Sequence, residues 1–206
     1  MRHFTFRPTL TLSGRSFKGL RGWSGKPLHP PLTDVPVTAY LFVAVFDILS
    51  IALHTAHPSV GHQLFLAAGW TLAGGVAVSL LTALTGAVDW YRSSEPGTQA
   101  RRTINAHAIT MITVTVLVLV DVIVRFTAYS ERGWAPVGIV VLSAAAAVLV
   151  SIGASLGGSL VYDYGFNVET AGDHPVWHKS EIDVMPGHHA PTPEPAAPAA
   201  PSVIEK

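Results

Sequence analysis

Four long apolar stretches separated by short polar segments dominate the sequence, and they run over residues 32–53, 63–88, 104–126 and 136–161. Each is long enough to cross the hydrocarbon core of a bilayer as a helix, which takes about 20 residues. The third stretch is rich in β-branched residues, which favour strands in water. Lipid nevertheless requires backbone groups to pair within their own segment, so we expect a helix there too. The pattern predicts an all-α integral membrane protein, a four-helix bundle with up-down-up-down topology.

The segments on either side of the apolar region differ from it in composition. Residues 1–27 carry six basic side chains and no acidic one, and we expect a cytosolic N-terminal arm. The membrane domain is expected to span residues 28–166. Residues 167–206 are polar and then rich in Pro and Ala. We expect them to form a cytosolic tail that is disordered from about Met185 onward, because such a composition buries little apolar surface.

Charge is scarce and unevenly placed along the chain. Charged residues make up 13% of the sequence, against about 25% in soluble domains. The arm shares its side of the expected spans with Arg92, Arg101 and Arg102, whereas the opposite side has only Arg125 and Arg132. The positive-inside rule therefore predicts a multi-pass protein of the cell membrane with both termini in the cytosol.

Several classes of chemistry are excluded by the residues that the sequence lacks. The chain contains no cysteine, which rules out disulfides, thiolate catalysis and cysteine-ligated zinc or iron–sulfur clusters within it. The sequence has no phosphate-binding loop, no dinucleotide-binding fingerprint and no nucleophile elbow. The basic arm matches no nucleic-acid-binding fold, so no nucleic-acid partner is expected. These absences favour a non-enzymatic membrane component.

The first candidate site is a pair of histidines, His29 and His107, near the cytosolic ends of the first and third spans. These spans are expected to face each other across a four-helix bundle, so the two imidazoles are candidates to ligate haem iron, as in haem b, or another metal. Asp34, Asp89 and Asn105 are placed to support the two imidazoles. The alternative is that both histidines only cap helix ends or form interfacial hydrogen bonds.

The second candidate site consists of ionisable residues inside the spans, namely Asp47, Asp121 and Arg125. Carboxylates in a membrane are costly and are usually functional or paired. One interpretation is a proton or cation relay in the bundle interior. The other is structural, with Arg125 pairing with Asp121 one helical turn away and Asp47 fixing the register of its helix by hydrogen bonding.

The remaining histidines favour a simpler interpretation. His54, His57 and His62 lie within nine residues between the first two spans, and they are either a copper or zinc site or a solvated loop, of which the loop is the more common. In the tail, loose metal binding at best is expected for His174, His178, His188 and His189.

Small residues predict where the helices approach each other. Gly69, Ala73 and Ala77 repeat every four residues in the second span, and the fourth contains a Gly153–Gly157 pair. We expect the fourth helix to be the most tightly packed. Residues 84–88 also echo residues 156–160, which aligns Gly86 with Gly158 and suggests two similar helix hairpins.

Several motifs together resemble those of one bacterial membrane-protein family. They are Gly25 to Pro36, Asp47, Gly86 with Asp89 and Trp90, Asn105 with His107, and Gly157 to Gly165. In combination they resemble the family called domain of unknown function 2231, over residues 25–170. The resemblance implies a four-span bacterial plasma-membrane protein without an assigned activity. Some relatives are joined to a Rieske-type iron–sulfur domain, which implies a redox membrane complex or a Rieske-type protein as a candidate partner.

These observations lead to one interpretation with two alternatives. The favoured function is a redox-associated membrane component that binds haem or another metal at His29 and His107. The alternatives are a proton or small-ion relay through Asp47 and Asp121, and a structural assembly partner.

Overall fold

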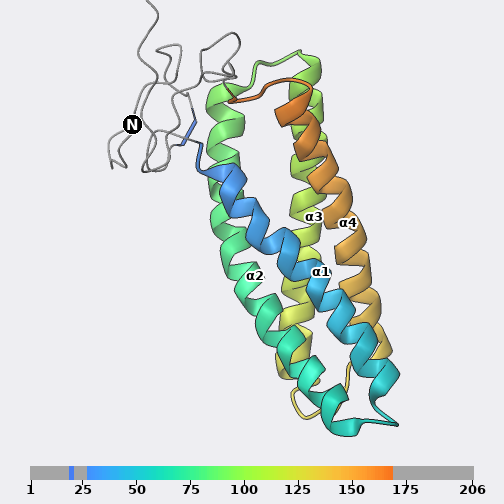
Figure 1. Ribbon diagram of the computed structural model, residues 1–206. Helices are drawn as coiled ribbons and strands as arrows, with labels where there is room; N and C mark the ends of the chain where they lie inside the picture. The colour runs from blue at the N-terminus through green and yellow to red at the C-terminus, as the bar shows by residue number, and fades with distance from the viewer. Residues whose placement is uncertain (1–18, 21–26, 169–206) are drawn as a thin grey trace, which may run out of the picture. The chain divides into compact units, whose positions relative to one another are not determined.

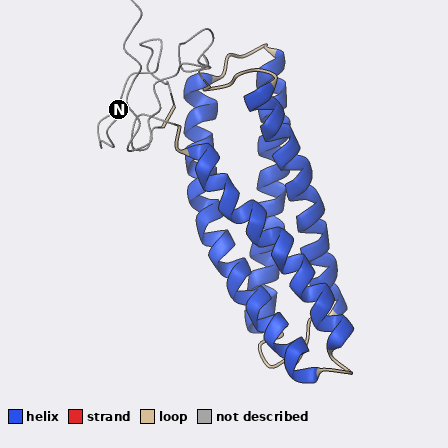
Figure 2. Ribbon diagram, in the orientation of Figure 1, coloured by secondary structure: helices blue, strands red, loops and turns tan. Residues whose placement is uncertain are grey.

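Four long helices form the part of the chain that the computed structural model describes, which is residues 19–20 and 27–168. They are α1 (His29–Leu53), α2 (Pro58–Ser93), α3 (Gln99–Thr127) and α4 (Val137–Tyr162). Successive helices run antiparallel (Figure 1), and short loops connect them (Figure 2). The predicted all-α helical bundle is thus confirmed.

The helices pack in a ring in which α1 and α3 lie across one diagonal. The largest interface joins α1 to α2, the next joins α3 to α4, and α4 closes onto α1. The interface between α2 and α3 is the smallest, and α1 and α3 have no direct backbone packing. Any link between α1 and α3 must therefore be made by long side chains that cross the interior.

The helices extend beyond the predicted apolar stretches, because backbone hydrogen bonding continues where hydrophobicity ends. Prolines fit the helix starts, since a first-turn residue needs no intrahelical N–H partner. Pro30 and Pro31 follow His29 at the start of α1, and Pro58 is the first residue of α2. The hydroxyl of Thr98 accepts a hydrogen bond from the backbone N–H of Arg101 at 3.1 Å, which caps α3.

An apolar layer fills the middle of the bundle. Its largest side chains are at most 1% exposed, and all four helices contribute to it; they include Tyr40, Val43, Leu72, Val114, Val118 and Val150. A smaller cluster of Phe65, Ala135 and Ile139 lies near the start of α4.

The outer surface of the bundle is also apolar, as expected for helices in lipid. Large side chains such as Leu84 and Val141 are 66% and 60% exposed, and all four helices have the length and composition of membrane spans. Packing within the chain covers only part of each apolar stretch, so lipid must cover the rest.

Two predictions about packing are wrong. Ala77 is exposed, because a four-residue repeat drifts around the helix. Gly69 of the repeat is buried, and the neighbouring Gly75 provides the close approach to Ala39 and Tyr40 of α1. The fourth helix is not the most tightly packed. In its most apolar segment 28% of the residues are buried, compared with 39% in the corresponding segments of α1 and α2. Its small residues lie on several faces, and only some of them face α3.

Candidate functional site

His29 is the first residue of α1, and its imidazole is anchored to α2. Its Nδ1 lies 2.9 Å from the backbone oxygen of Thr82 and 3.3 Å from the hydroxyl of Thr85. The ring rests against Gly86, where an added Cβ would lie 2.7 Å from the imidazole Cε1. A side chain larger than hydrogen at position 86 would therefore displace the ring.

His107 is anchored to α4 in the same way. Its Nδ1 lies 2.8 Å from the backbone oxygen of Gly153, and its ring rests against Gly157, with 3.2 Å between an added Cβ and the imidazole Cε1. In both hairpins the accepting carbonyl precedes the supporting glycine by four residues. The predicted echo between hairpins is therefore present at this site, but Gly86 corresponds to Gly157 and not to Gly158.

The two imidazoles meet across the α1–α3 diagonal. Their ring centres are 6.4 Å apart and the ring planes are nearly perpendicular, at 86°. A carbonyl oxygen only accepts hydrogen bonds, so each Nδ1 must carry a proton, and in the neutral form of each ring the Nε2 is the nitrogen with a free lone pair. A metal ion held by one nitrogen of each ring, at about 2 Å from each nitrogen, would fit between ring centres that lie roughly 6 Å apart. The observed spacing matches this arrangement.

Of the three residues expected to support the imidazoles, Asp89 is the one that lies near an imidazole, that of His29. It is 5% exposed, lies one turn beyond Gly86 and accepts a hydrogen bond from the backbone N–H of Leu20 at 3.0 Å. Asn105 is exposed, and its side-chain oxygen accepts a hydrogen bond from the indole of Trp90 at 2.8 Å. Asp34 is exposed on α1 and lines an outer groove instead.

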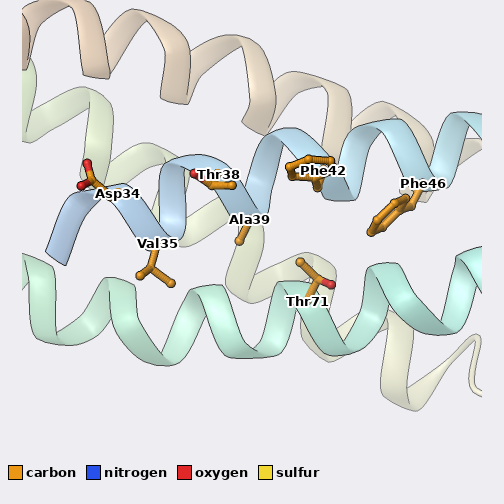
Figure 3. A pocket seen from close by; sticks show the side chains of 7 residues that line it. All are labelled: Asp34, Val35, Thr38, Ala39, Phe42, Phe46 and Thr71. Atoms are coloured by element: carbon orange, nitrogen blue, oxygen red, sulfur yellow. The ribbon is translucent and has the colours of Figure 1, made fainter. Parts of the chain in front are cut away.

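That groove lies between α1 and α2 on the outside of the bundle (Figure 3). It has a volume of about 640 Å³ and is mostly apolar. Its lining consists of Asp34, Val35, Thr38, Ala39, Phe42, Phe46 and Thr71. The groove opens on the outer, lipid-facing surface of the bundle, and neither His29 nor His107 lines it.

Sequence reasoning missed the backbone partners of the histidines. Thr82 and Gly153 contribute carbonyl oxygens, which every residue has, so no sequence signal identifies them. The small residues Gly86 and Gly157 did stand out in the sequence. That the imidazole rings pack against them depends on how each helix is rotated about its axis, which the sequence does not specify.

Within the part of the chain that the structure describes, the other histidines do not gather into a metal site. No group of three or more His, Cys, Asp or Glu gathers as a metal site in residues 19–20 and 27–168. The ring of His54 stacks on Trp134 with 4.6 Å between ring centres, while His57 and His62 are exposed. The tail histidines, together with the basic arm up to residue 18, lie outside the described residues.

The three ionisable residues of the second candidate site form one buried ion triad, Asp47, Arg125 and Asp121. The Arg125 guanidinium donates to both oxygens of Asp47, with Nη1–Oδ1 2.9 Å and Nη2–Oδ2 2.7 Å. It also donates to Asp121, with Nε–Oδ1 3.2 Å and Nη2–Oδ2 3.3 Å. The predicted pairing of Arg125 with Asp121 is confirmed. The closer partner, however, is Asp47 on the diagonal helix.

Comparison with known proteins gives one match. A family model described as "Predicted membrane protein (DUF2231)" matches residues 25–170, a range that contains all four helices, both histidines and the ion triad. Neither the curated proteins nor the solved structures include a match.

Proposed function

We propose that this chain, which belongs to the DUF2231 family of predicted membrane proteins, is a redox-associated membrane component that binds a metal centre between His29 and His107. Haem b is the form of this centre that we favour. The family description assigns no activity, so the proposal depends on the geometry of the two imidazoles.

The observation that supports it is the matched anchoring of the two rings at a spacing of 6.4 Å. A hydrogen bond from the second ring nitrogen to a carbonyl is the usual way in which proteins orient a metal-binding histidine. Here both rings have such a bond, to Thr82 and Gly153. His29 and His107 would together hold the haem iron, and the chemistry that the group would supply there is electron transfer.

The proposed setting is the cytosolic end of the bundle. Arg92, Arg101 and Arg102 lie in or beside the α2–α3 connection, at the same end as His29, and the positive-inside rule assigns such residues to the cytosol. We propose a redox protein as the partner at this end, either a Rieske-type protein, as the family resemblance implies, or another redox membrane complex.

An absorption spectrum with metal analysis of protein purified in detergent from haem-replete cells tests this function. We expect a Soret band and about one haem per chain, as ligation by two histidines implies. His29→Ala and His107→Ala should each abolish the band. His57→Ala is the matched control, since His57 is exposed on the opposite end, and it should keep the spectrum of the parent.

Three results would overturn or change the assignment. A colourless parent protein without bound iron, copper or zinc would remove the proposed function. Bound metal that is lost in both histidine variants, but without a Soret band, would retain the site and replace haem with a bare ion. Loss of colour in His57→Ala to the same extent would show that the effect is not specific to the pair.

A second candidate function is a proton or small-ion relay through Asp47 and Asp121. The observation that favours it is that both carboxylates are buried inside helices of membrane-spanning length. The pairing of both carboxylates with Arg125 is equally suited to a structural role. A measurement of proton flux, described in the Discussion, distinguishes the relay from the structural role.

A further inference from the structure

The ion triad has an unbalanced charge. Two carboxylates, Asp47 and Asp121, share the single guanidinium of Arg125, so full ionisation would leave a net charge of −1. Asp47 is 0% exposed, Asp121 1% and Arg125 3%. A net charge in such a setting is costly, because neither water nor a counter-ion can solvate it.

In residues 19–20 and 27–168, no other charged group pairs with the triad to compensate this charge. The guanidinium lies against the Phe65 ring of α2 at 5.0 Å, and its stem lies against Gly69. The only titratable side chain of α4 is Tyr162, which is at the opposite end of the bundle. In the adjacent loops, His54 stacks on Trp134 and Arg132 lies over the Tyr129 ring. Among the described residues, Arg125 is the only cation paired with either carboxylate.

The two carboxylates contact Arg125 differently. Asp47 forms the forked, two-bond pair that an ionised carboxylate makes with arginine, at 2.9 and 2.7 Å. The contacts of Asp121 are longer, at 3.2 and 3.3 Å. Both Oδ2 atoms contact the same Nη2, so the two carboxylates compete for one guanidinium nitrogen, which Asp47 holds at the shorter distance.

We propose that the ion triad is a proton-binding site that holds one exchangeable proton on Asp121. The proton comes from water, forms an O–H bond with the Asp121 carboxylate and leaves the triad neutral, with Asp47 and Arg125 as the ionised pair. The site is independent of the histidine pair, because Asp121 lies 14 residues beyond His107 along α3, about 21 Å at 1.5 Å per residue.

Infrared spectroscopy of the purified full-length protein tests this proposal, since a protonated carboxyl group has a C=O band separate from that of a carboxylate. We expect such a band at neutral pH that shifts in D₂O and is lost in Asp121→Asn. It should also be lost in Asp47→Asn, because Asp121 must then ionise to neutralise Arg125. Asp34→Asn, which removes an exposed carboxylate, is the control and should keep the band.

Thermal unfolding provides a second measurement. Asp121→Asn mimics the neutral acid and should unfold close to the parent temperature, whereas Asp47→Asn removes the ionised partner and should unfold at a clearly lower one. An Asp121→Asn spectrum identical to that of the parent would overturn the proposal. Equal destabilisation by the two variants would do so as well. If Asp47→Asn fails to fold, the presence or loss of the C=O band in Asp121→Asn still tests whether Asp121 holds the proton.

Discussion

Arg125 of α3 and Asp47 of α1 form a two-bond ion pair across the bundle, at 2.9 and 2.7 Å, although their helices do not pack directly. At the other end the same two helices meet again through His29 and His107. The diagonal is therefore bridged by polar side chains near both ends, with an apolar layer between them. Each bridge is expected to respond to substitution in its own way.

Gly86, against which the His29 imidazole packs, is expected to be sensitive to the addition of a single methyl group. In Gly86→Ala the new Cβ would lie 2.7 Å from His29 Cε1, and the ring must move. Because misorienting a metal ligand typically costs about 10- to 100-fold in affinity, we expect a loss of that size in a haem or metal titration. Gly74→Ala is the control, since no atom lies within 4 Å of its added Cβ. Equal binding by the two variants would contradict the proposed role of Gly86.

Removing the cation of the ion triad is expected to destabilise the fold. Arg125→Gln leaves two buried carboxylates without a partner, and breaking a buried ion pair costs about 3–5 kcal/mol. Unfolding in detergent, followed by circular dichroism, measures this loss. Arg132→Gln removes an exposed arginine and should change stability by less than about 0.5 kcal/mol. Similar stabilities of the two variants would show that the triad contributes little.

A buried hydroxyl joins three segments at the end of the bundle where α1 terminates. The Ser50 Oγ donates to the backbone oxygen of Gly61 at 2.7 Å and accepts from the N–H of Ala135 at 3.1 Å. Ser50→Ala leaves the buried N–H of Ala135 without its partner, so we expect a loss of about 1–3 kcal/mol in chemical unfolding. Ser151→Ala is the comparison, because Ser151 is exposed and bonds only within its own helix. A neutral Ser50→Ala would mean that water replaces the hydroxyl.

Orientation in the membrane is testable because the chain has no cysteine of its own. Glu95 and Glu131 are exposed in loops at opposite ends of the bundle. A membrane-impermeant maleimide should label Glu131→Cys in intact cells and Glu95→Cys only after lysis, if the histidine end is cytosolic. The reverse pattern would invert the proposed topology without altering the bundle.

Proton flux separates the relay from the structural interpretation of the triad. Val114, Val118 and Leu72 are at most 1% exposed and lie in the apolar layer between the triad and the histidine pair. These side chains cannot transfer protons, and the Tyr40 hydroxyl of the layer is hydrogen-bonded to Ser79 at 2.7 Å. We therefore expect proteoliposomes of the parent protein to hold a pH gradient as well as empty vesicles do. A flux that Asp47→Asn abolishes would establish the relay instead.

Part of the candidate site was predictable from local spacing. Asp121 and Arg125 are one helical turn apart, so their contact follows from helix geometry alone. His107 and Asp121 are 14 residues apart and so share nearly one helix face, and Val114 and Val118 on that face are buried. Asp34 and Asn105 show the limit of this reasoning, because proximity to a histidine in sequence did not determine which way either side chain faces.

The sequence by itself determined that this protein is a bundle of four membrane-length helices with few ionisable groups inside. Long apolar stretches leave no other structure that satisfies the backbone in lipid. Only the tertiary structure decided that Arg125 pairs most closely with Asp47, and that the carbonyls of Thr82 and Gly153 orient the two imidazoles. The reason is physical: lipid makes the outside of each helix as apolar as its inside, so hydrophobic periodicity does not reveal which face turns inward, and side-chain packing alone sets the rotation.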